Sequence, residues 1–246
     1  MRFSYTQEIF YRNLQGKIAW IIPGSETAPH GSEANRRRKL KLVVLGANGR
    51  TGRLVVREAL DIGDSVTAVV RSDAKRLALQ HSRLRVVVGD PCDPTFLGKI
   101  IAGHDAVIST LGGRRPTKGA TSVYWRSADA IVEAAWNAGI AKIAVTSSAL
   151  LFPPGRLLDR VLAIIVPNVV QSAARMEQTF DNAKLDVVVA RCGFLTDDKD
   201  PGYRAELGSL PFDGSSVPRL GVARFLLDAV RKPSSGLKIY GVSGPV

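Results

Sequence analysis

Short apolar segments alternate with amphipathic segments from residue 40 to the C-terminus. Segments with the length and residue types of buried strands lie at 41–46, 65–71, 84–89, 105–111, 141–147, 185–191 and 237–241. Segments with apolar residues at helical spacing lie at 50–62, 73–80, 94–102, 121–138, 168–184 and 218–231. This alternation is typical of parallel strands joined by helices. It predicts an α/β fold with a single Rossmann-type, doubly wound parallel sheet.

Residues 1–39 lack this periodicity and contain a polar stretch rich in turn-forming residues. We expect them to form a short, flexible N-terminal extension outside the core, and residues 40–246 to form one domain. A chain of 246 residues, 45% of them hydrophobic, is long enough to bury one sizeable core. A real tail, a transit-like segment and a start codon assigned too early all fit residues 1–39.

The first predicted strand runs directly into a glycine-rich turn. Gly46, Gly49 and Gly52 recur at three-residue spacing, and a segment with helical spacing follows. Glycine permits a tight turn and a close approach of the backbone to a diphosphate, and the first N–H groups of the helix bind the anion. Glycine-rich turns without a ligand are also common, but a complete strand–helix–strand unit surrounds this one. We predict that residues 40–246 are an NAD(P)-binding domain whose dinucleotide site contains Gly46, Ala47, Asn48, Gly49, Arg50, Thr51 and Gly52.

The end of the second predicted strand indicates which dinucleotide binds. In NAD sites an acidic residue accepts hydrogen bonds from the ribose 2′-hydroxyl, whereas an arginine in this region binds the 2′-phosphate of NADP. Here the strand ends at Arg71, Arg76 follows, and Asp73 is better placed as the N-cap of the next helix. We therefore predict NADP(H) as the cofactor. The alternative is that both arginines are ordinary surface residues.

Charge and cysteine content narrow the remaining classes of function. The net charge of +12 suits an anionic cofactor, and no nucleic-acid-binding motif accompanies it, so we expect no nucleic-acid partner. No apolar run approaches the roughly 20 residues of a membrane span, so we expect no membrane partner. Cys92 and Cys192 give neither a disulfide framework nor a metal-ligand spacing, and the histidines are isolated in the sequence. We expect a cytoplasmic protein without a metal site.

Six motifs, in the same order along the chain, resemble those of one protein superfamily. They lie at residues 46–52, 70–71, 88–90, 105–112, 145–149 and 191–197. Through these motifs, the chain from Leu40 to about Gly241 resembles the atypical short-chain dehydrogenase/reductase superfamily. Within that superfamily it is similar to the NAD(P)H-binding group that includes NmrA-like proteins and the flavin reductase biliverdin reductase B.

The resemblance implies further cofactor contacts at the carboxyl ends of the strands. The implied contacts are Asp90 and Pro91 near the adenine, Thr110, Leu111 and Gly112 under the ribose and phosphates, Ser147 beside the active-site serine, and Gly193, Phe194 and Leu195 near the nicotinamide carboxamide. The alternative for Asp90 is that it is a plain turn residue without a cofactor contact. The alternative for Gly112 is that it belongs to a flexible loop.

The chain departs from the typical pattern of the superfamily where the chemistry occurs. Typical members carry Tyr-x-x-x-Lys after the fifth strand, with the tyrosine as general acid. Residues 150–185 contain no tyrosine, and Ala173 stands where many relatives have lysine. Ser148 matches the active-site serine, and we assign it a hydrogen bond to substrate or nicotinamide; the alternative is a serine that caps the turn after the strand. Tyr124 and Trp125 either pack in the core or line the substrate pocket.

This pattern resembles the flavin and biliverdin reductase branch, in which positioning promotes hydride transfer and protons can come from solvent. We therefore expect an NADPH-dependent oxidoreductase that transfers hydride to a small, flat acceptor, such as a flavin, a quinone or a tetrapyrrole-like molecule, or to a related carbonyl compound. The alternative is an NmrA-like redox sensor that binds NADP without turnover. Epimerase or dehydratase chemistry on nucleotide sugars is disfavoured, because it needs the missing tyrosine. The sequence leaves the oligomeric state open.

Overall fold

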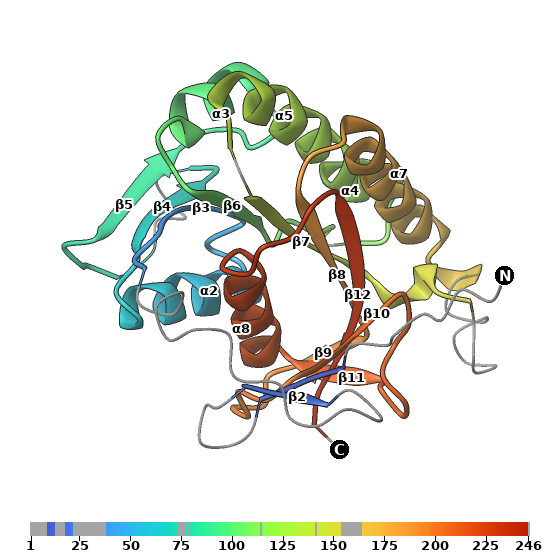
Figure 1. The fold of residues 1–246 in the computed structure, drawn as a ribbon. Helices are drawn as coiled ribbons and strands as arrows, with labels where there is room; N and C mark the ends of the chain where they lie inside the picture. The colour runs from blue at the N-terminus through green and yellow to red at the C-terminus, as the bar shows by residue number, and fades with distance from the viewer. Residues whose placement is uncertain are drawn as a thin grey trace, which may run out of the picture.

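A ten-stranded sheet in the order β2-β1-β10-β12-β8-β7-β6-β3-β4-β5 forms the centre of the fold (Figure 1). The structure is a computed structural model that describes residues 9–12, 18–21, 38–72, 77, 79–113, 115–140, 142–153 and 164–245. The seven predicted strands pair in parallel, as expected. They are β3 (Lys41–Leu45), β4 (Ser65–Val70), β5 (Leu84–Val88), β6 (Ala106–Ser109), β7 (Lys142–Ser148), β8 (Val187–Cys192) and β12 (Leu237–Ser243).

The order of the parallel strands determines where a ligand can bind. From β3 the chain moves outward to β4 and β5, and it then returns to the other side of β3 to form β6, β7 and β8. In open α/β sheets, ligands bind outside the carboxyl ends of the strands at the point where the strand order reverses. Here that point lies between β3 and β6, which end at Leu45 and Ser109.

Helices cover both faces of the sheet (Figure 1). Along β3, Val43 and Leu45 point to one helical layer and Leu42 and Val44 to the other, and all four side chains are fully buried. The predicted doubly wound α/β fold is therefore confirmed. One layer contains α3 (Pro94–Ile101), α5 (Val123–Ala138) and α7 (Pro167–Ala183), and the other contains α2 (Arg50–Asp61) and α8 (Arg219–Ala229).

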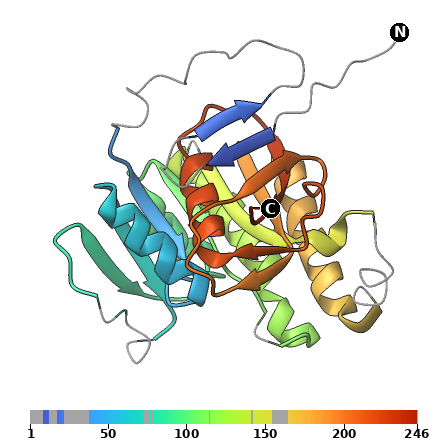
Figure 2. The same cartoon turned by 90° about the horizontal axis from the view of Figure 1, so that it is seen from below.

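Antiparallel strands extend the sheet beyond β12. β10 (Arg204–Leu207) pairs with β12, and two strands from the N-terminal region, β1 (Ile9–Arg12) and β2 (Ile18–Ile21), continue the sheet from β10. Figure 2 shows these two blue strands beside the orange and red C-terminal segments. They lie at the end of the sheet opposite to β5, so they extend its edge without entering the doubly wound core.

The segment predicted as a helix over 73–80 differs from expectation. Residues 77, 79 and 80 belong to no helix, so the prediction is wrong for them, and residues 73–76 and 78 lie outside the described residues. A stable surface helix needs a stripe of apolar side chains against the core. In the described part of this segment Leu77 packs against the core, whereas Leu79 is exposed.

Helix length and surface charge bear on possible partners. Within the described ranges, no helix combines the length and the apolar character needed to cross a membrane.

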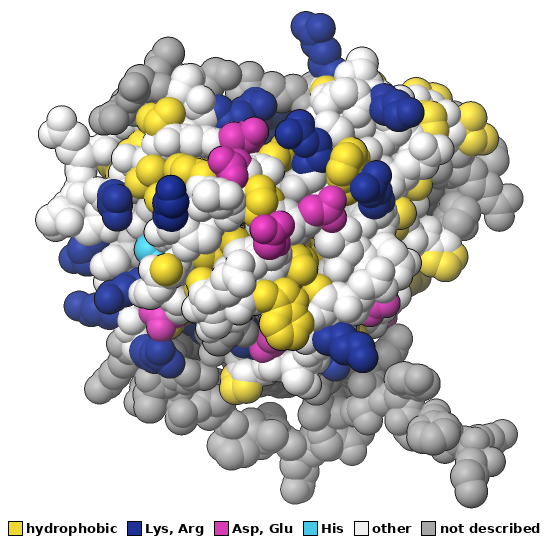
Figure 3. Space-filling model, turned by 90° about the horizontal axis from the view of Figure 1, so that it is seen from above, with side chains coloured by type: hydrophobic (Ala, Val, Ile, Leu, Met, Phe, Trp, Pro, Cys, Tyr) yellow, Lys and Arg dark blue, Asp and Glu magenta, His cyan; other side chains and the backbone are white. Residues whose placement is uncertain are grey.

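On the face that carries α3, α5 and α7, acidic side chains lie among the basic ones (Figure 3). This face therefore mixes both signs of charge.

Candidate functional site

The glycine-rich turn after β3 has the backbone geometry that was predicted from its spacing. Gly46 has a φ of +75°, in the left-handed region that favours glycine. The N–H of Gly49 donates a hydrogen bond of 2.8 Å to the carbonyl oxygen of Gly46, which closes the turn. A Cβ on Gly46 would lie 3.0 Å from Oγ1 of Thr110, so the turn also packs closely against the segment after β6.

The start of α2 is shaped to receive an anion. A Cβ on Gly52 would lie 2.2 Å from the carbonyl oxygen of Gly46, so glycine allows the helix to approach the turn. No side chain caps the helix at Gly49, and its first turn contains no acidic residue. The first N–H groups of α2 and the positive end of its dipole are thus available to a diphosphate. The residues present fit the dinucleotide that the sequence predicted.

The segment after β6 lies against the glycine-rich turn. Thr110 Oγ1 donates to the carbonyl oxygen of Leu45 at 3.2 Å, which ties the end of β6 to the end of β3. Leu111 is half-buried against the core that includes α5, and Gly112 is exposed. The contacts of these residues with a cofactor stay a prediction.

The residues predicted to contact the adenosine part of the cofactor lie after β4 and β5. Arg71 is exposed and directly follows β4. Asp90 Oδ1 accepts a hydrogen bond of 2.9 Å from the N–H of Cys92, so Asp90 has the turn-forming role considered as its alternative, and Pro91 between them is buried. Arg76 lies outside the described residues.

The pKa of Cys92 reflects its burial and the charged side chains near the turn after β5. Burial and the neighbouring Asp90 carboxylate raise the pKa of its thiol to about 11, although the positive charges of Arg126 and Arg71 act in the opposite direction. A thiol with this pKa is protonated at neutral pH and is a poor nucleophile. The two arginines lie close enough to place positive charge near the turn that contains Asp90 and Cys92.

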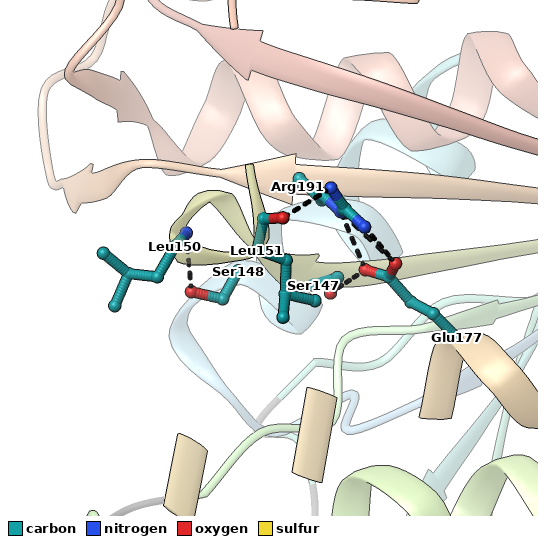
Figure 4. A network of polar contacts seen from close by, with 6 residues as sticks. All are labelled: Ser147, Ser148, Leu150, Leu151, Glu177 and Arg191. Atoms are coloured by element: carbon teal, nitrogen blue, oxygen red, sulfur yellow. Dashed lines mark hydrogen bonds and ion pairs between the residues drawn. The ribbon is translucent and has the colours of Figure 1, made fainter. Parts of the chain in front are cut away.

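A buried charged network lies at the ends of β7 and β8 (Figure 4). Ser147 Oγ donates to Glu177 Oε1 at 2.5 Å, and Arg191 donates from Nη2 to Glu177 Oε2 at 2.7 Å. Arg191 also donates from Nη1 to the carbonyl oxygen of Leu151 at 3.1 Å. Its guanidinium lies over the ring of Phe152, with Cζ 4.6 Å from the ring centroid. Glu177 was not predicted as a site residue, and Ser147 was predicted only to lie near the cofactor.

Ser148 caps a turn in this structure. Its Oγ accepts a hydrogen bond of 3.3 Å from the N–H of Leu150, at the start of the short helix η2 (Ala149–Leu151) (Figure 4). This is the alternative role considered for Ser148. The hydroxyl is half-buried at the carboxyl edge of the sheet, beside Ser147. A contact with substrate stays a prediction.

The segment predicted to approach the nicotinamide forms a small second sheet. β9 (Phe194–Thr196) pairs in parallel with β11 (Ser216–Pro218), and the N–H of Phe194 donates to the carbonyl oxygen of Ser215 at 2.9 Å. A Cβ on Gly193 would lie 2.3 Å from the same oxygen, which explains glycine there. Phe194 is 56% exposed and Leu195 is 38% exposed. Both therefore present apolar surface next to the end of β8.

An acidic residue connects the glycine-rich turn with the C-terminal part of the chain. Asp197 accepts from Arg50 Nη1 at 2.7 Å through one carboxylate oxygen and from Arg219 Nη1 at 2.7 Å through the other. Arg219 is buried at the start of α8, whereas Arg50 and Asp197 are exposed. Sequence analysis placed Asp197 in a motif but assigned it no contact. Within the described part of the chain, no group of three His, Cys, Asp or Glu side chains could hold a metal ion.

Tyr124 reaches the same edge of the sheet from the first turn of α5. A Cβ on Gly112 would lie 3.2 Å from the hydroxyl of Tyr124, so the phenol lies directly beside the predicted cofactor path. Burial raises the pKa of Tyr124, and the nearby thiol of Cys192 adds to this effect. Trp125 faces α7 instead, where Arg175 Cζ lies 3.6 Å from its ring centroid.

Comparisons with known proteins agree with this geometry. A family model described as NAD(P)H-binding matches residues 46–233. The photosystem II assembly factor Ycf39 of Synechocystis sp. is 32% identical over 124 residues, which cover 49% of this chain. The match spans 38% of the length of that curated relative.

Solved structures share the fold at low sequence identity. A short-chain dehydrogenase/reductase from Veillonella parvula, in complex with NADP, has a TM-score of 0.68 at 19% identity, covering 85% of this chain and 96% of that chain. ChuY, an anaerobillin reductase from Escherichia coli O157:H7, has a TM-score of 0.64 at 20% identity, covering 83% of this chain and 97% of that chain. Because the family model covers most of the chain and the glycine-rich turn fits a dinucleotide, the protein belongs to the NAD(P)H-binding family and takes a nicotinamide cofactor.

Proposed function

We propose that this protein is an NADPH-dependent reductase that transfers hydride to a small, flat acceptor, such as a flavin, a quinone or a tetrapyrrole-like molecule. The observations that carry the proposal are the uncapped start of α2 behind Gly46 and Gly52, and the exposed aromatic ring of Phe194 just after β8. The first feature suits a diphosphate, and the second offers a stacking surface to a planar ring. The similarity in fold to an anaerobillin reductase supports the same class of acceptor.

The preference for NADPH over NADH rests on charge at the end of β4. The strand is followed by Arg71 and Ser72, so the two described residues after the strand carry no carboxylate for a ribose 2′-hydroxyl. Arg71 is exposed and can donate paired N–H groups to a 2′-phosphate. The Veillonella parvula structure of the same fold is in complex with NADP, which is consistent with this preference.

The residues of the site act mainly by positioning. A bound reduced nicotinamide supplies a hydride, that is, two electrons and one proton. Holding two planar rings in the correct geometry can remove several kcal/mol from the barrier without an acid or base. The network of Ser147, Glu177 and Arg191 holds the ends of β7 and β8 to α7.

The relatives favour a second candidate function. The relative from Synechocystis sp. is a photosystem II assembly factor, which describes a role in assembly. In this alternative, NADP binding regulates an interaction and no acceptor is reduced. The capping role of Ser148 fits such a site, because the serine then serves structure alone.

Turnover distinguishes the two candidates. The full chain is incubated with NADPH and, in separate reactions, with FMN, menadione or dichlorophenolindophenol, and NADPH oxidation is followed by absorbance. Catalytic oxidation that depends on one of these acceptors supports the reductase. Binding of NADPH without oxidation across the panel contradicts the reductase and supports the regulator.

A further inference from the structure

The phenol of Tyr124 lies beside the segment that follows β6. A Cβ on Gly112, in this segment, would lie 3.2 Å from the Tyr124 hydroxyl. β6 pairs with β7, which ends at Ser148, the residue that matched the superfamily's active-site serine. Tyr124 therefore lies at the carboxyl end of the strand next to β7, in a chain that lacks Tyr-x-x-x-Lys.

Hydrogen bonding leaves the hydroxyl of Tyr124 available. Every fully buried side-chain nitrogen or oxygen among the described residues has a hydrogen-bond partner. The described residues provide none for the Tyr124 hydroxyl, and the neighbouring Gly112 is exposed and adds no side chain. A ligand that lies over Gly112 can therefore reach this hydroxyl.

The other hydroxyls at this edge are engaged with the protein. Thr110 donates to the carbonyl oxygen of Leu45, and Ser147 donates to Glu177. Ser148 accepts from the N–H of Leu150 and keeps its own proton. Tyr124 is thus better placed than Thr110 and Ser147 to donate to a bound molecule, and its phenol is more acidic than the hydroxyl of Ser148.

We infer that Tyr124 is the proton donor to the acceptor in the proposed reductase, and this inference rests on that proposed function. A quinone that has accepted hydride at one oxygen carries a negative charge on the other. The phenolic proton of Tyr124 passes to this second oxygen, and water returns a proton to the phenolate. NADPH is oxidised to NADP⁺, the quinone is reduced to the hydroquinone, and the tyrosine ends the cycle neutral.

The environment of Tyr124 suits this role. Burial holds its pKa above the ordinary value, so the phenol is neutral and carries its proton at neutral pH. A neutral phenol in a partly desolvated site donates a strong hydrogen bond to a developing negative charge. The role also explains how a family member without Tyr-x-x-x-Lys can protonate its substrate.

The test compares wild type with Tyr124→Phe, which keeps the ring and its packing. Menadione accepts hydride and needs a proton, whereas N-methylacridinium accepts hydride and needs none. We expect kcat/KM for menadione to fall on the order of 100-fold while the value for N-methylacridinium changes by less than about threefold. Independently of turnover, the infrared carbonyl stretch of menadione bound with NADP⁺ is expected at lower frequency in wild type than in the variant.

Tyr240→Phe is the matched control, because Tyr240 lies in β12 and its ring packs 5.7 Å from that of Phe225 on α8. Equal menadione turnover in wild type and Tyr124→Phe, equal loss with both acceptors, or an unchanged carbonyl stretch overturns the role of Tyr124 alone. If wild type binds NADPH but reduces none of the acceptors, the proposed reductase fails and the role of Tyr124 fails with it. Unchanged NADPH binding and thermal unfolding show that the variant is folded.

Discussion

A Cβ on Gly52 would lie only 2.2 Å from the carbonyl oxygen of Gly46. This close approach brings the first turn of α2 against the turn after β3. The first N–H groups of the helix therefore lie beside that turn. No flexible side chain is involved, so the clash could be relieved only by moving the backbone of the turn or of the helix. The approach of these two glycines therefore sets the geometry on which the cofactor site depends.

Replacement of Gly52 by alanine tests this relationship. We expect Gly52→Ala to weaken NADPH binding at least about tenfold, and to lower the free energy of unfolding by about 1–3 kcal/mol, because the backbone must shift. Calorimetric titration and urea denaturation measure the two effects. Gly98→Ala is the control, because a Cβ on Gly98 in α3 would contact nothing within 4 Å. Wild-type affinity in Gly52→Ala would show that the turn does not hold the diphosphate.

Arg71 is expected to select the coenzyme. Arg71→Glu should weaken NADPH binding by about 2 kcal/mol and NADH binding much less, because the guanidinium faces only the 2′-phosphate in the proposed pose. Arg85→Glu makes the same change of charge at an exposed position on β5 and should leave the NADPH to NADH preference unchanged. An equal loss of both coenzymes in Arg71→Glu would contradict the selection.

The ion pair of Glu177 and Arg191 is expected to stabilise the fold strongly. Both side chains are largely buried, and Glu177→Gln leaves the Arg191 charge without a carboxylate. We expect a loss of about 3 kcal/mol in the free energy of unfolding, and a smaller loss when Glu177→Leu and Arg191→Met are combined. Urea denaturation measures both. Gln178→Ala, on the exposed side of α7, serves as the control, and a loss no greater than in this control would contradict the prediction.

His104 should make stability depend on pH. Burial lowers the pKa of His104, so the folded state favours the neutral imidazole, whose Nε2 lies 2.9 Å from Thr67 Oγ1. The unfolded chain binds a proton near pH 6.5, and the folded chain binds it only at lower pH. The contribution of His104 is therefore fully present above about pH 6.5 and is lost as the pH falls toward its folded pKa. Denaturation midpoints across this range should decline more in wild type than in His104→Gln; parallel curves would exclude this origin.

Much of the fold could be predicted because periodicity is a local signal. The strand at 41–45 follows from a short run of apolar residues, and the helix at 50–61 follows from apolar residues at helical spacing. β9, β10 and β11 were missed, because strands of three or four residues contain too few positions to show a period. The helix prediction is wrong at residues 77, 79 and 80, because the local pattern does not reveal that Leu79 stays exposed.

The site could be predicted only in part, for a different physical reason. A positive φ such as that of Gly46 favours glycine, and glycine is visible in the sequence. The glycine-rich turn could therefore be predicted. The bridge from Asp197 to Arg50 joins residues far apart in the chain, and no spacing rule connects them. Glu177 and Arg191 did carry a signal, because a charge inside an otherwise apolar helix face or strand needs a buried partner.

The central claim is that the turn from Gly46 to Gly52 binds a nicotinamide dinucleotide and that Arg71 favours its phosphorylated form. Isothermal titration of the purified full chain with NADPH, and separately with NADH, measures this directly. The account predicts heat of binding with a one-to-one stoichiometry for NADPH and a clearly weaker affinity for NADH. Absence of detectable binding with either coenzyme, at concentrations that saturate other members of the family, would contradict the account.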